Sequence, residues 1–424
     1  MSTANFNIKE HVVEAQHIRE YARATSFSEE EILKLAVKQY TPLDNPNPQP
    51  GDVTIIGAHA NGFPKELYEA LWDELYLRSK ANGFRIRSIW IADAAHQNQS
   101  AILNEEKLGN DPSWMDHPRD LLHMINHFRK EMPLPLFGVG HSFGGNNLAC
   151  LSLIHPRLLT SLILLDPVIL QQNPTGAGGR GAPMASTFRR DLWPSREAAA
   201  AGFRKNPFYK AWDPRVLEAW NKHGVRETPT LLYPNEKGSV TLSTPKYHEV
   251  QTFIRPTFPD PINGPLAPIT HYSHADIDPA VPAGEPFYSP APYIVLQQLP
   301  RLRPSVLYIF GGTSFMAPPE HNAEKMRVTG TGAGGSGGAA KGRVKEVVLK
   351  GIGHLVAMEA PVQTAENTAK WIGQEMQLWR QEAEKFAGWA KMGVIEKQVI
   401  SEKWKNILGG DPRNRKVTDG AAKL

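Results

Sequence analysis

Apolar runs of strand length alternate with amphipathic runs of helix length along the first part of the chain. The pattern predicts an opening antiparallel pair of strands and then four strands with three helices between them, over residues 7–21, 32–40, 53–58, 65–80, 84–92, 117–131, 135–141, 144–155 and 160–166. Apolar strands separated by helices are typical of a mostly parallel sheet that is covered on both faces. We therefore expect an α/β protein built on such a sheet.

One of these apolar runs ends in a serine flanked by glycines. Residues 136–147 read LFGVGHSFGGNN, so the strand expected at 135–141 passes through a Gly-X-Ser-X-Gly turn directly into a helix. In a nucleophile elbow of this kind the serine hydroxyl is exposed, and the next amide faces the oxyanion of a tetrahedral intermediate. The sequence predicts Ser142 as a nucleophile and the amide of Phe143 as an oxyanion donor. The alternative is that Ser142 only caps the helix.

A serine nucleophile needs a neutral imidazole as its base and a carboxylate that orients the imidazole. The strand expected at 343–349 leads into Gly351-Ile352-Gly353-His354, where the glycines would let an imidazole approach the elbow. In enzymes with this elbow the base follows the nucleophile along the chain. His354 is therefore the predicted base, whereas His96 and His117 precede the elbow.

The orienting carboxylate has two candidates. Residues 311–316, which follow a strand expected at 305–310, contain no carboxylate, and Glu320 is the first one after them. One strand earlier, the apolar residues 162–165 run directly into Asp166, at the same rim of the sheet as the elbow. We predict Asp166 as the acid and keep Glu320 as the alternative. Asp166 could also be a structural residue that caps a loop before a proline.

A second oxyanion donor is expected in the loop after the third strand. Residues 57–64 read GAHANGFP, and their small side chains would let a backbone amide approach a substrate. The amide of Asn61 is our prediction, with that of Gly62 as the alternative. His59 is expected to pack beneath this loop.

The alternation of strands and helices stops after residue 169. Residues 170–300 are rich in proline, glycine and aromatic residues and contain two helical pieces, at 196–205 and 214–223. We expect them to form a cap over the carboxyl ends of the strands; the alternative is an independent second domain. The predicted parts are a first part of the core at 1–169, the cap at 170–300, a second part of the core with a long C-terminal helix at 301–405, and a flexible tail at 406–424.

Composition excludes several other classes of protein. The 424 residues carry a net charge of +4 that is spread along the chain, without basic runs interleaved with aromatic residues, so we expect no nucleic-acid partner. Cys150 is the one cysteine, and the glycine-rich residues 329–338 carry no phosphate-binding motif, so neither a metal nor a cofactor is predicted. The sequence contains no apolar run of membrane-spanning length, and the first residues lack the apolar core of a signal peptide, so we expect neither a membrane span nor secretion.

The C-terminal residues suggest a cellular address. The chain closes on Ala422-Lys423-Leu424, a variant of the Ser-Lys-Leu peroxisomal signal, after a polar stretch at 411–420 that is expected to be a disordered tether. We predict a location in the peroxisomal matrix, with the peroxisomal import receptor as a partner. A nearly continuous helix is expected from 361 to about 400. Most of its apolar stripe is predicted to be core, and its end could pack against a second subunit in a homodimer.

Several longer strings resemble a known family. They are PKELYE at 64–69, LWDEL at 71–75, IAD at 91–93, NQS at 98–100, WMDH at 114–117, GHSFGG at 140–145 and LLDP at 164–167. In these strings the whole chain resembles the fungal peroxisomal α/β-hydrolases of secondary-metabolite (toxin) biosynthesis, a group that includes the acyl-CoA hydrolase of mycophenolic acid biosynthesis. The resemblance implies an eight-stranded α/β-hydrolase sheet and an acid after the sixth strand, which favours Asp166. Ala60-Asn61 and residues 329–342 depart from the family pattern.

The predicted function is that of a serine hydrolase in which Ser142 attacks, His354 acts as base and then as acid, and Asp166 orients His354. The resemblance implies an acyl-CoA thioester of a secondary metabolite or other bulky acid as the substrate, cleaved through an acyl-serine intermediate. A carboxylester hydrolase and a cyclase or acyltransferase remain as alternatives on the same three residues, and a ligand-binding protein on an inactive scaffold is the alternative outside enzymes. Four arginines of the insertion could meet CoA phosphates, although a solvated charged face is the preferred interpretation: Arg180, Arg189, Arg190 and Arg204.

Overall fold

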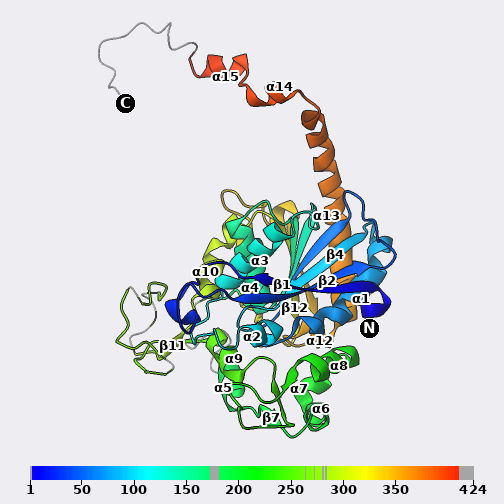
Figure 1. The fold of residues 1–424 in the computed structure, drawn as a ribbon. Helices are drawn as coiled ribbons and strands as arrows, with labels where there is room; N and C mark the ends of the chain where they lie inside the picture. The colour runs from blue at the N-terminus through cyan, green and yellow to red at the C-terminus, as the bar shows by residue number, and fades with distance from the viewer. Residues whose placement is uncertain are drawn as a thin grey trace, which may run out of the picture. The chain divides into compact units, whose positions relative to one another are not determined.

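An eight-stranded mixed sheet forms the centre of the molecule (Figure 1). This computed structural model describes residues 2–171, 181–262, 264–271, 273–278, 281 and 284–409. The strands follow the spatial order β1-β2-β4-β3-β5-β6-β12-β13, with bounds Phe6–Glu14, Lys34–Pro42, Ile86–Ala92, Val53–Ala58, Leu136–His141, Ser161–Leu165, Ser305–Gly311 and Val344–Leu349. β1 and β2 pair antiparallel, as do β2 and β4, and the other pairs are parallel. The predicted α/β fold and the opening antiparallel pair are confirmed.

Helices cover both faces of this sheet (Figure 1). The principal ones are α1 Glu69–Ser79, α2 Asn98–Leu103, α3 Asp116–His127, α4 Phe143–Ile154, α10 Ala291–Gln298, α11 Pro319–Val328, α12 Val356–Glu359 and α13 Pro361–Ala390. α4 packs between α3 and α10 on one face. The first half of α13 is held to the sheet by Trp371, whose indole donates to Ser161 Oγ at 2.8 Å. The carboxyl ends of the parallel strands are thereby left for the loops that carry the predicted chemistry.

The first strand ends earlier than its apolar pattern predicts. The run at 7–21 was expected to be one strand, but β1 stops at Glu14 because the following residues turn away to pair with α3. The amide of Gln16 donates to Asp120 Oδ1 at 2.9 Å, and the Arg19 guanidinium makes two bonds to the Asp120 carboxylate, at 2.8 and 3.0 Å. This buried ion pair replaces the strand pairing that the sequence pattern suggested.

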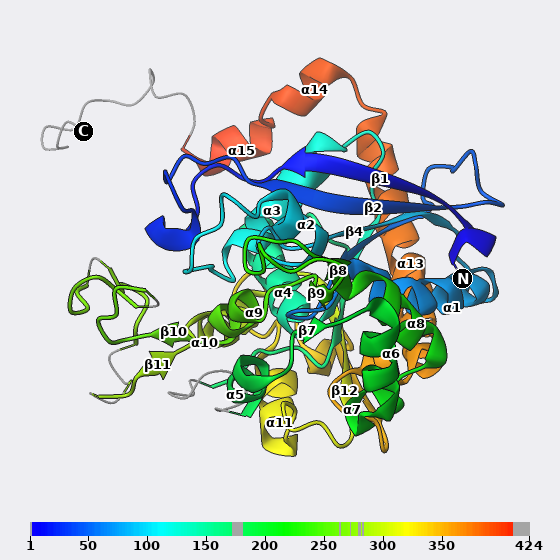
Figure 2. The ribbon, with the colours of Figure 1, turned by 60° about the horizontal axis from the view of Figure 1, so that its bottom comes forward.

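The insertion between β6 and β12 is built from short elements around an aromatic core. Its described elements are α5 Gly181–Phe188, β7 Leu192–Trp193, α6 Arg196–Lys205, α7 Pro207–Lys210, α8 Pro214–His223, β8 Val225–Glu227, β9 Val240–Leu242, α9 Lys246–Phe253, β10 Arg255–Pro256 and β11 Phe287–Tyr288. In Figure 1, α5 to α9 lie below the strands of the sheet, and in Figure 2, where that side is turned forward, they lie in front of it. Phe203 meets Tyr209 and Trp220 with ring centroids 4.9 and 5.8 Å apart. Residues 1–376 form one compact unit, which argues against an independent domain in this insertion.

Residues 377–409 belong to a second unit. The helix predicted from 361 to about 400 ends at Ala390, and the short helices α14 Val394–Gln398 and α15 Glu402–Ile407 follow. The apolar stripe of this region is only partly core. Trp371 and Met376 are buried, whereas Phe386 and Trp389 are 60% and 48% exposed. Within the described residues no helix is long and apolar enough to cross a membrane. Ala422-Lys423-Leu424, and most of the tail predicted at 406–424, lie outside the described residues.

Candidate active site

The turn between β5 and α4 has the strained geometry of a nucleophile elbow. Ser142 stands at its apex with φ 55° and ψ −114°, outside the regions that residues with a side chain ordinarily adopt. A Cβ on Gly140 would lie 2.5 Å from the carbonyl oxygen of Gly144, and one on Gly144 would lie 2.2 Å from that of Ala58. Both positions must therefore be glycine. The Ser142 side chain makes no capping bond to α4, which overturns the alternative that it is a helix cap.

The three residues predicted to act together lie in contact. Ser142 Oγ is 2.8 Å from His354 Nε2, and His354 Nδ1 is 3.3 Å from Asp166 Oδ2. The second approach is not aligned as a hydrogen bond, and within the described part of the chain neither Asp166 carboxylate oxygen receives one. Catalytic contacts are often loose without substrate and tighten when it binds. Glu320, the alternative acid, is exposed in the first turn of α11, and no ion pair joins it to His354 among the described residues.

Three hydrogen bonds hold the loop that carries His354. Glu359 accepts hydrogen bonds from the amides of Gly353, at 2.7 Å, and Leu355, at 3.2 Å. The carbonyl oxygen of His354 accepts a bond from His141 Nε2 at 3.0 Å. Glu359 was not assigned a role from the sequence. A carboxylate that closely follows a Gly-X-Gly-His turn was the available signal for this role.

The loop after β3 holds the predicted oxyanion donor between two amides that already have partners. The amide of Ala60 donates to the Tyr68 hydroxyl at 2.8 Å, and the amide of Gly62 donates to Gln97 Oε1 at 2.7 Å. Within the described residues the Asn61 amide between them has no partner. The Gly62 alternative is therefore wrong for this structure, because its amide is already engaged. At the elbow, Phe143 is the first residue of α4, whose initial amides lack intrahelical acceptors.

Histidines beneath these loops are structural and neutral. His59 donates from Nδ1 to the carbonyl oxygen of Ala60 at 2.9 Å and accepts at Nε2 from the amide of Ala94 at 2.9 Å, as expected for a residue packed under the loop. Burial lowers the pKa of His59, and it lowers the pKa of His141 to about 3. Neither ring competes with His354 for the proton of Ser142.

A fully buried lysine lies near enough to the predicted acid to be influenced by its charge. Lys325 of α11 is fully buried, and its Nζ donates to the carbonyl oxygen of His321 at 3.4 Å and lies 5.5 Å from the centre of the Phe310 ring. Burial lowers the pKa of Lys325 to about 8, an effect that the nearby Asp166 and Glu324 carboxylates partly offset. Sequence reasoning missed this residue, because nothing in the local pattern of α11 marks one lysine as buried.

A large apolar cavity opens directly above Ser142. Its volume is about 990 Å³, and Asn61, Ser142, Phe143 and His354 belong to its wall. The insertion contributes much of the remaining lining, including Trp193, Phe203, Phe208, Tyr209 and Phe253. This volume lies at the upper end of the usual range for small-molecule sites. The cavity can therefore take a bulky apolar group against the serine.

Two of the four arginines considered as contacts for CoA phosphates, Arg189 and Arg190, line this cavity. Arg189 pairs with the buried Glu249 carboxylate. Arg190 lies with its guanidinium 5.8 Å from the centre of the Trp193 ring and donates from Nε to the carbonyl oxygen of Leu192 at 2.8 Å. Arg204 does not line the cavity, and Arg180 lies outside the described residues.

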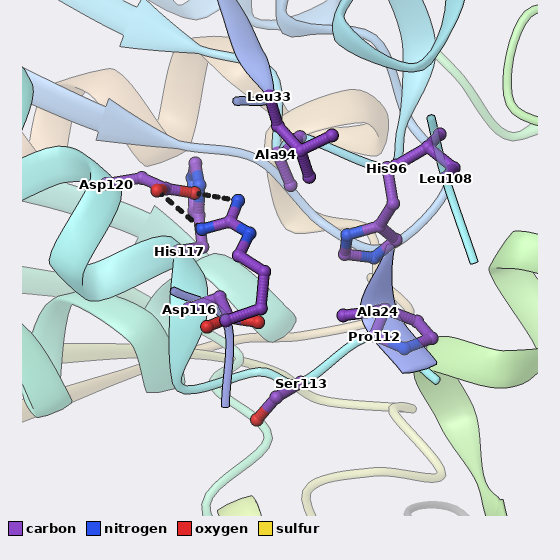
Figure 3. A pocket seen from close by; sticks show the side chains of 12 residues that line it. Ala24, Leu33, Ala94, His96, Leu108, Pro112, Ser113, Asp116, His117 and Asp120 are labelled. Carbon is purple, nitrogen blue, oxygen red and sulfur yellow. Dashed lines mark hydrogen bonds and ion pairs between the residues drawn. The ribbon is translucent and has the colours of Figure 1, made fainter. Parts of the chain in front are cut away.

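A second, much smaller cavity lies behind the elbow (Figure 3). Its volume is about 10 Å³, room for about one water molecule. His117, in its wall, stacks on Phe143 with ring centroids 6.1 Å apart, and neither of its ring nitrogens has a partner among the described residues. Burial, with His59 and Arg19 nearby, holds the pKa of His117 well below its usual value. This cavity is too small to hold a substrate.

Known proteins with related sequences include two that are named as acyl-CoA thioesterases. No protein-family model matches the chain. A type I acyl-CoA thioesterase, mpaH′, from Penicillium brevicompactum is 44% identical over 444 aligned positions that cover 100% of both chains, and mpaH from Penicillium roqueforti (strain FM164) is 44% identical over 98% of both. The abhydrolase domain-containing protein AFT2-1 of Alternaria alternata is 27% identical over 65% of this chain and 98% of its own.

Solved structures support the fold independently. The peroxisomal α/β-hydrolase Lpx1 from Saccharomyces cerevisiae superposes with a TM-score of 0.67 at 16% identity, over 92% of this chain and 99% of its own. E-2-(acetamidomethylene)succinate hydrolase superposes with a TM-score of 0.53 at 13% identity, over 85% and 99%. At full length and 44% identity, the sequence relationship to the thioesterases is much closer than these structural ones. The chain therefore has the α/β-hydrolase fold and belongs to the mpaH family of type I acyl-CoA thioesterases.

Proposed function

We propose that this chain is a serine hydrolase that cleaves an acyl-CoA thioester of a bulky acid through an acyl-Ser142 intermediate. The observation that carries the proposal is the 2.8 Å contact of Ser142 Oγ with His354 Nε2 at the wall of a cavity of about 990 Å³. The 44% identity to relatives named as acyl-CoA thioesterases supports the choice of substrate class.

The acylation half of the reaction follows from this geometry. His354 Nε2 takes the hydroxyl proton as Ser142 Oγ attacks the thioester carbonyl carbon, and the Asp166 carboxylate stabilises the imidazolium and holds Nδ1–H toward itself. The amides of Phe143 and Asn61 donate to the oxyanion as it forms. Collapse of the tetrahedral intermediate breaks the C–S bond, and His354 returns the proton to the departing CoA sulfur.

Deacylation uses the same groups with water as the nucleophile. His354 Nε2 removes a proton from a water molecule as that water attacks the acyl carbon. The oxyanion that forms again accepts hydrogen bonds from the amides of Phe143 and Asn61. The C–O bond to Ser142 then breaks as His354 returns the proton to the serine oxygen. The products are the free acid and the unchanged enzyme. A cyclase or acyltransferase would differ only in this step, since a nucleophile of the acyl group or of a second substrate would replace water.

We assign the insertion at 170–300 as a cap that selects the acyl group and contacts CoA. Five of its aromatic side chains line the cavity, which suits a bulky acyl group. Arg190 is the cation proposed to bind a CoA phosphate, because within the described chain no carboxylate lies within ion-pair distance of it and it lies in the cavity wall. Arg189 is a weaker candidate because Glu249 already engages it.

The proposal also includes a location in the peroxisomal matrix and a homodimeric state. Ala422-Lys423-Leu424 supports import into the peroxisomal matrix by the receptor that reads this signal. The exposed Phe386, Trp389 and Ile395 of the C-terminal unit support a homodimer. Deleting the last three residues should leave a tagged protein in the cytosol, and Ile395→Asp should shift a dimer toward monomer in sedimentation velocity.

A substrate panel tests the proposed function. The purified full-length protein is incubated with acyl-CoAs of different acids and with the methyl ester of each acid, and products are identified by mass. We expect kcat/KM for the CoA form to exceed that for the matched ester by more than the intrinsic difference in reactivity, because the CoA part adds binding energy in the transition state. Equal or greater activity on the esters would favour the carboxylester hydrolase. Release of a cyclic product, or transfer of the acyl group to a second substrate, would favour the cyclase or acyltransferase.

A further inference from the structure

The loop that carries the proposed oxyanion donor is held by a buried side chain on each side of that donor. Before Asn61, the Ala60 amide donates to the Tyr68 hydroxyl at 2.8 Å. After it, the Gly62 amide donates to Gln97 Oε1 at 2.7 Å. Tyr68 is 1% exposed and Gln97 is fully buried. Two of three consecutive amides are thus satisfied from within the protein, and the middle one is left for a ligand.

The side chain of Asn61 is fixed as well. Its Oδ1 accepts from Gln97 Nε2 at 2.8 Å, and its Nδ2 donates to the carbonyl oxygen of Glu249, in α9 of the insertion, at 3.0 Å. Gln97 therefore uses both ends of its amide on this loop. Because the side chain and both neighbouring amides are tied, the Asn61 peptide, which lies at the cavity wall, has little freedom to rotate.

The Tyr68 contact continues to the base. The Tyr68 hydroxyl, which accepts from Ala60, lies 2.9 Å from His141 Nδ1, and His141 Nε2 donates to the carbonyl oxygen of His354 at 3.0 Å. Each proton in this series of hydrogen bonds is donated once. The Tyr68 hydroxyl donates to His141 Nδ1, so the proton of the neutral His141 ring lies on Nε2, from which it is donated to the His354 carbonyl oxygen. Burial keeps His141 neutral by lowering its pKa to about 3. One buried tyrosine thus connects the oxyanion loop to the loop that carries the base.

We propose that Tyr68 and Gln97 are positioning residues that fix the Asn61 amide as the second oxyanion donor, one from each side of the loop. This inference rests on the proposed function, in which Ser142 forms a tetrahedral intermediate. The Asn61 side chain itself is held by Gln97 and by α9. Neither Tyr68 nor Gln97 lines the cavity, so both act through the loop.

The variants Tyr68→Phe and Gln97→Met remove the two holding contacts with little change of shape. Tyr76→Phe and Gln99→Met are matched controls at side chains that are not buried. Losing one oxyanion donor costs about 10²–10³ in kcat, so loosening it is expected to lower kcat by about tenfold in each variant. KM for the acyl-CoA should change by less than about twofold, because the ground-state thioester needs the amide less than the oxyanion does.

Two inhibitors separate positioning from general damage to the site. A trifluoromethyl ketone analogue of the acyl-CoA forms a tetrahedral adduct with Ser142, whereas a non-reactive CoA thioether only occupies the cavity. We expect the ketone to bind both variants about tenfold more weakly and the thioether to bind them as it binds the native protein. Equal loss for both ligands, or no loss for either, would overturn the inference.

Two further variants keep the test decisive. If Gln97→Met does not fold, Gln97→Glu retains an acceptor for the Gly62 amide and loses the donor to Asn61, and should show a smaller loss of the same kind. Ser142→Ala separates this inference from the proposed function. An inactive Ser142→Ala beside fully active Tyr68 and Gln97 variants would refute only the positioning role, whereas an active Ser142→Ala would refute the function itself.

Discussion

The amide of Asp166 donates to the carbonyl oxygen of Ile309 at 2.8 Å. This bond extends the parallel pairing of β6 with β12 one residue beyond the end of β6, and the positive φ of Asp166, 42°, then turns the chain out of the sheet. The carboxylate is thereby placed 3.3 Å from His354, which comes from the loop after β13. An acid at the end of the sixth strand can therefore reach the base directly across the end of its neighbour, β12.

Replacing this carboxylate is expected to impair catalysis without unfolding the protein. Asp166→Asn keeps the shape of the side chain but favours the wrong tautomer of His354, and by analogy with serine proteases kcat should fall by about 10⁴-fold. Glu320→Gln, at the alternative acid, should leave kcat nearly unchanged. Steady-state kinetics on one acyl-CoA measures both. The opposite pattern would move the acid to Glu320.

The proposed CoA contact predicts a difference between substrates. Arg190→Gln removes one charge-assisted bond to a phosphate, and a loss of about 1.5 kcal/mol corresponds to roughly a tenfold fall in kcat/KM for the acyl-CoA. The matched methyl ester lacks the phosphate, so its kcat/KM should hardly change. Arg204→Gln, outside the cavity, is the control. An equal effect of Arg190→Gln on both substrates would remove this residue from CoA binding.

A buried ion pair beneath the oxyanion loop predicts a large effect on stability. Lys65 Nζ lies 2.6 Å from Asp93 Oδ2, and both side chains are almost fully buried. Lys65→Met leaves the Asp93 charge without its partner, which typically costs about 3–5 kcal/mol in the free energy of unfolding. Urea unfolding of Lys65→Met is compared with that of Lys80→Met, which breaks an exposed pair with Asp44 and should cost under about 1 kcal/mol. If the two variants lose similar amounts of unfolding free energy, the buried pair contributes no more to stability than the exposed one.

The histidine behind the elbow predicts how stability depends on pH. Because the folded pKa of His117 is depressed below 6.5, the unfolded chain binds a proton there that the folded one does not. The free energy of unfolding should fall as the pH drops below about 6.5, by about 1.4 kcal/mol per pH unit for this group. His117→Phe keeps the stacking on Phe143 and should reduce the loss between pH 7 and pH 5 in urea titrations. His155→Asn, at an exposed histidine, is the control and should lose as much unfolding free energy between pH 7 and pH 5 as the native protein does. If His117→Phe also loses as much as the native protein, the prediction is contradicted.

Local patterns predicted the elements of the sheet well, because each strand is a short apolar run that helices cover. β3 has the predicted bounds, and so do the insertion helices α6 and α8, whose amphipathic runs begin at Ser195 and Asp213, side chains that cap each helix. The elbow could also be predicted, because a side chain at position 140 or 144 would collide with backbone atoms, so both positions must be glycine.

What the sequence did not predict depends on contacts between distant segments. β1 ends at Glu14 because Arg19 pairs with Asp120, a residue about a hundred positions away. Glutamine residues are common on surfaces, so the two bonds of Gln97 to the oxyanion loop leave no local trace. Lys325 reads as an ordinary residue of an exposed helix, and only the packed structure buries it.

Covalent labelling of Ser142 tests the central claim most directly. The full-length protein is treated with a fluorophosphonate, with and without prior saturation by an acyl-CoA, and the modified peptide is identified by mass. We expect stoichiometric modification at Ser142, slowed by the acyl-CoA, and a loss of hydrolysis of about a millionfold in Ser142→Ala with its thermal unfolding unchanged. Labelling of a different serine, or thioester hydrolysis by Ser142→Ala at a rate near that of the native protein, would contradict the account.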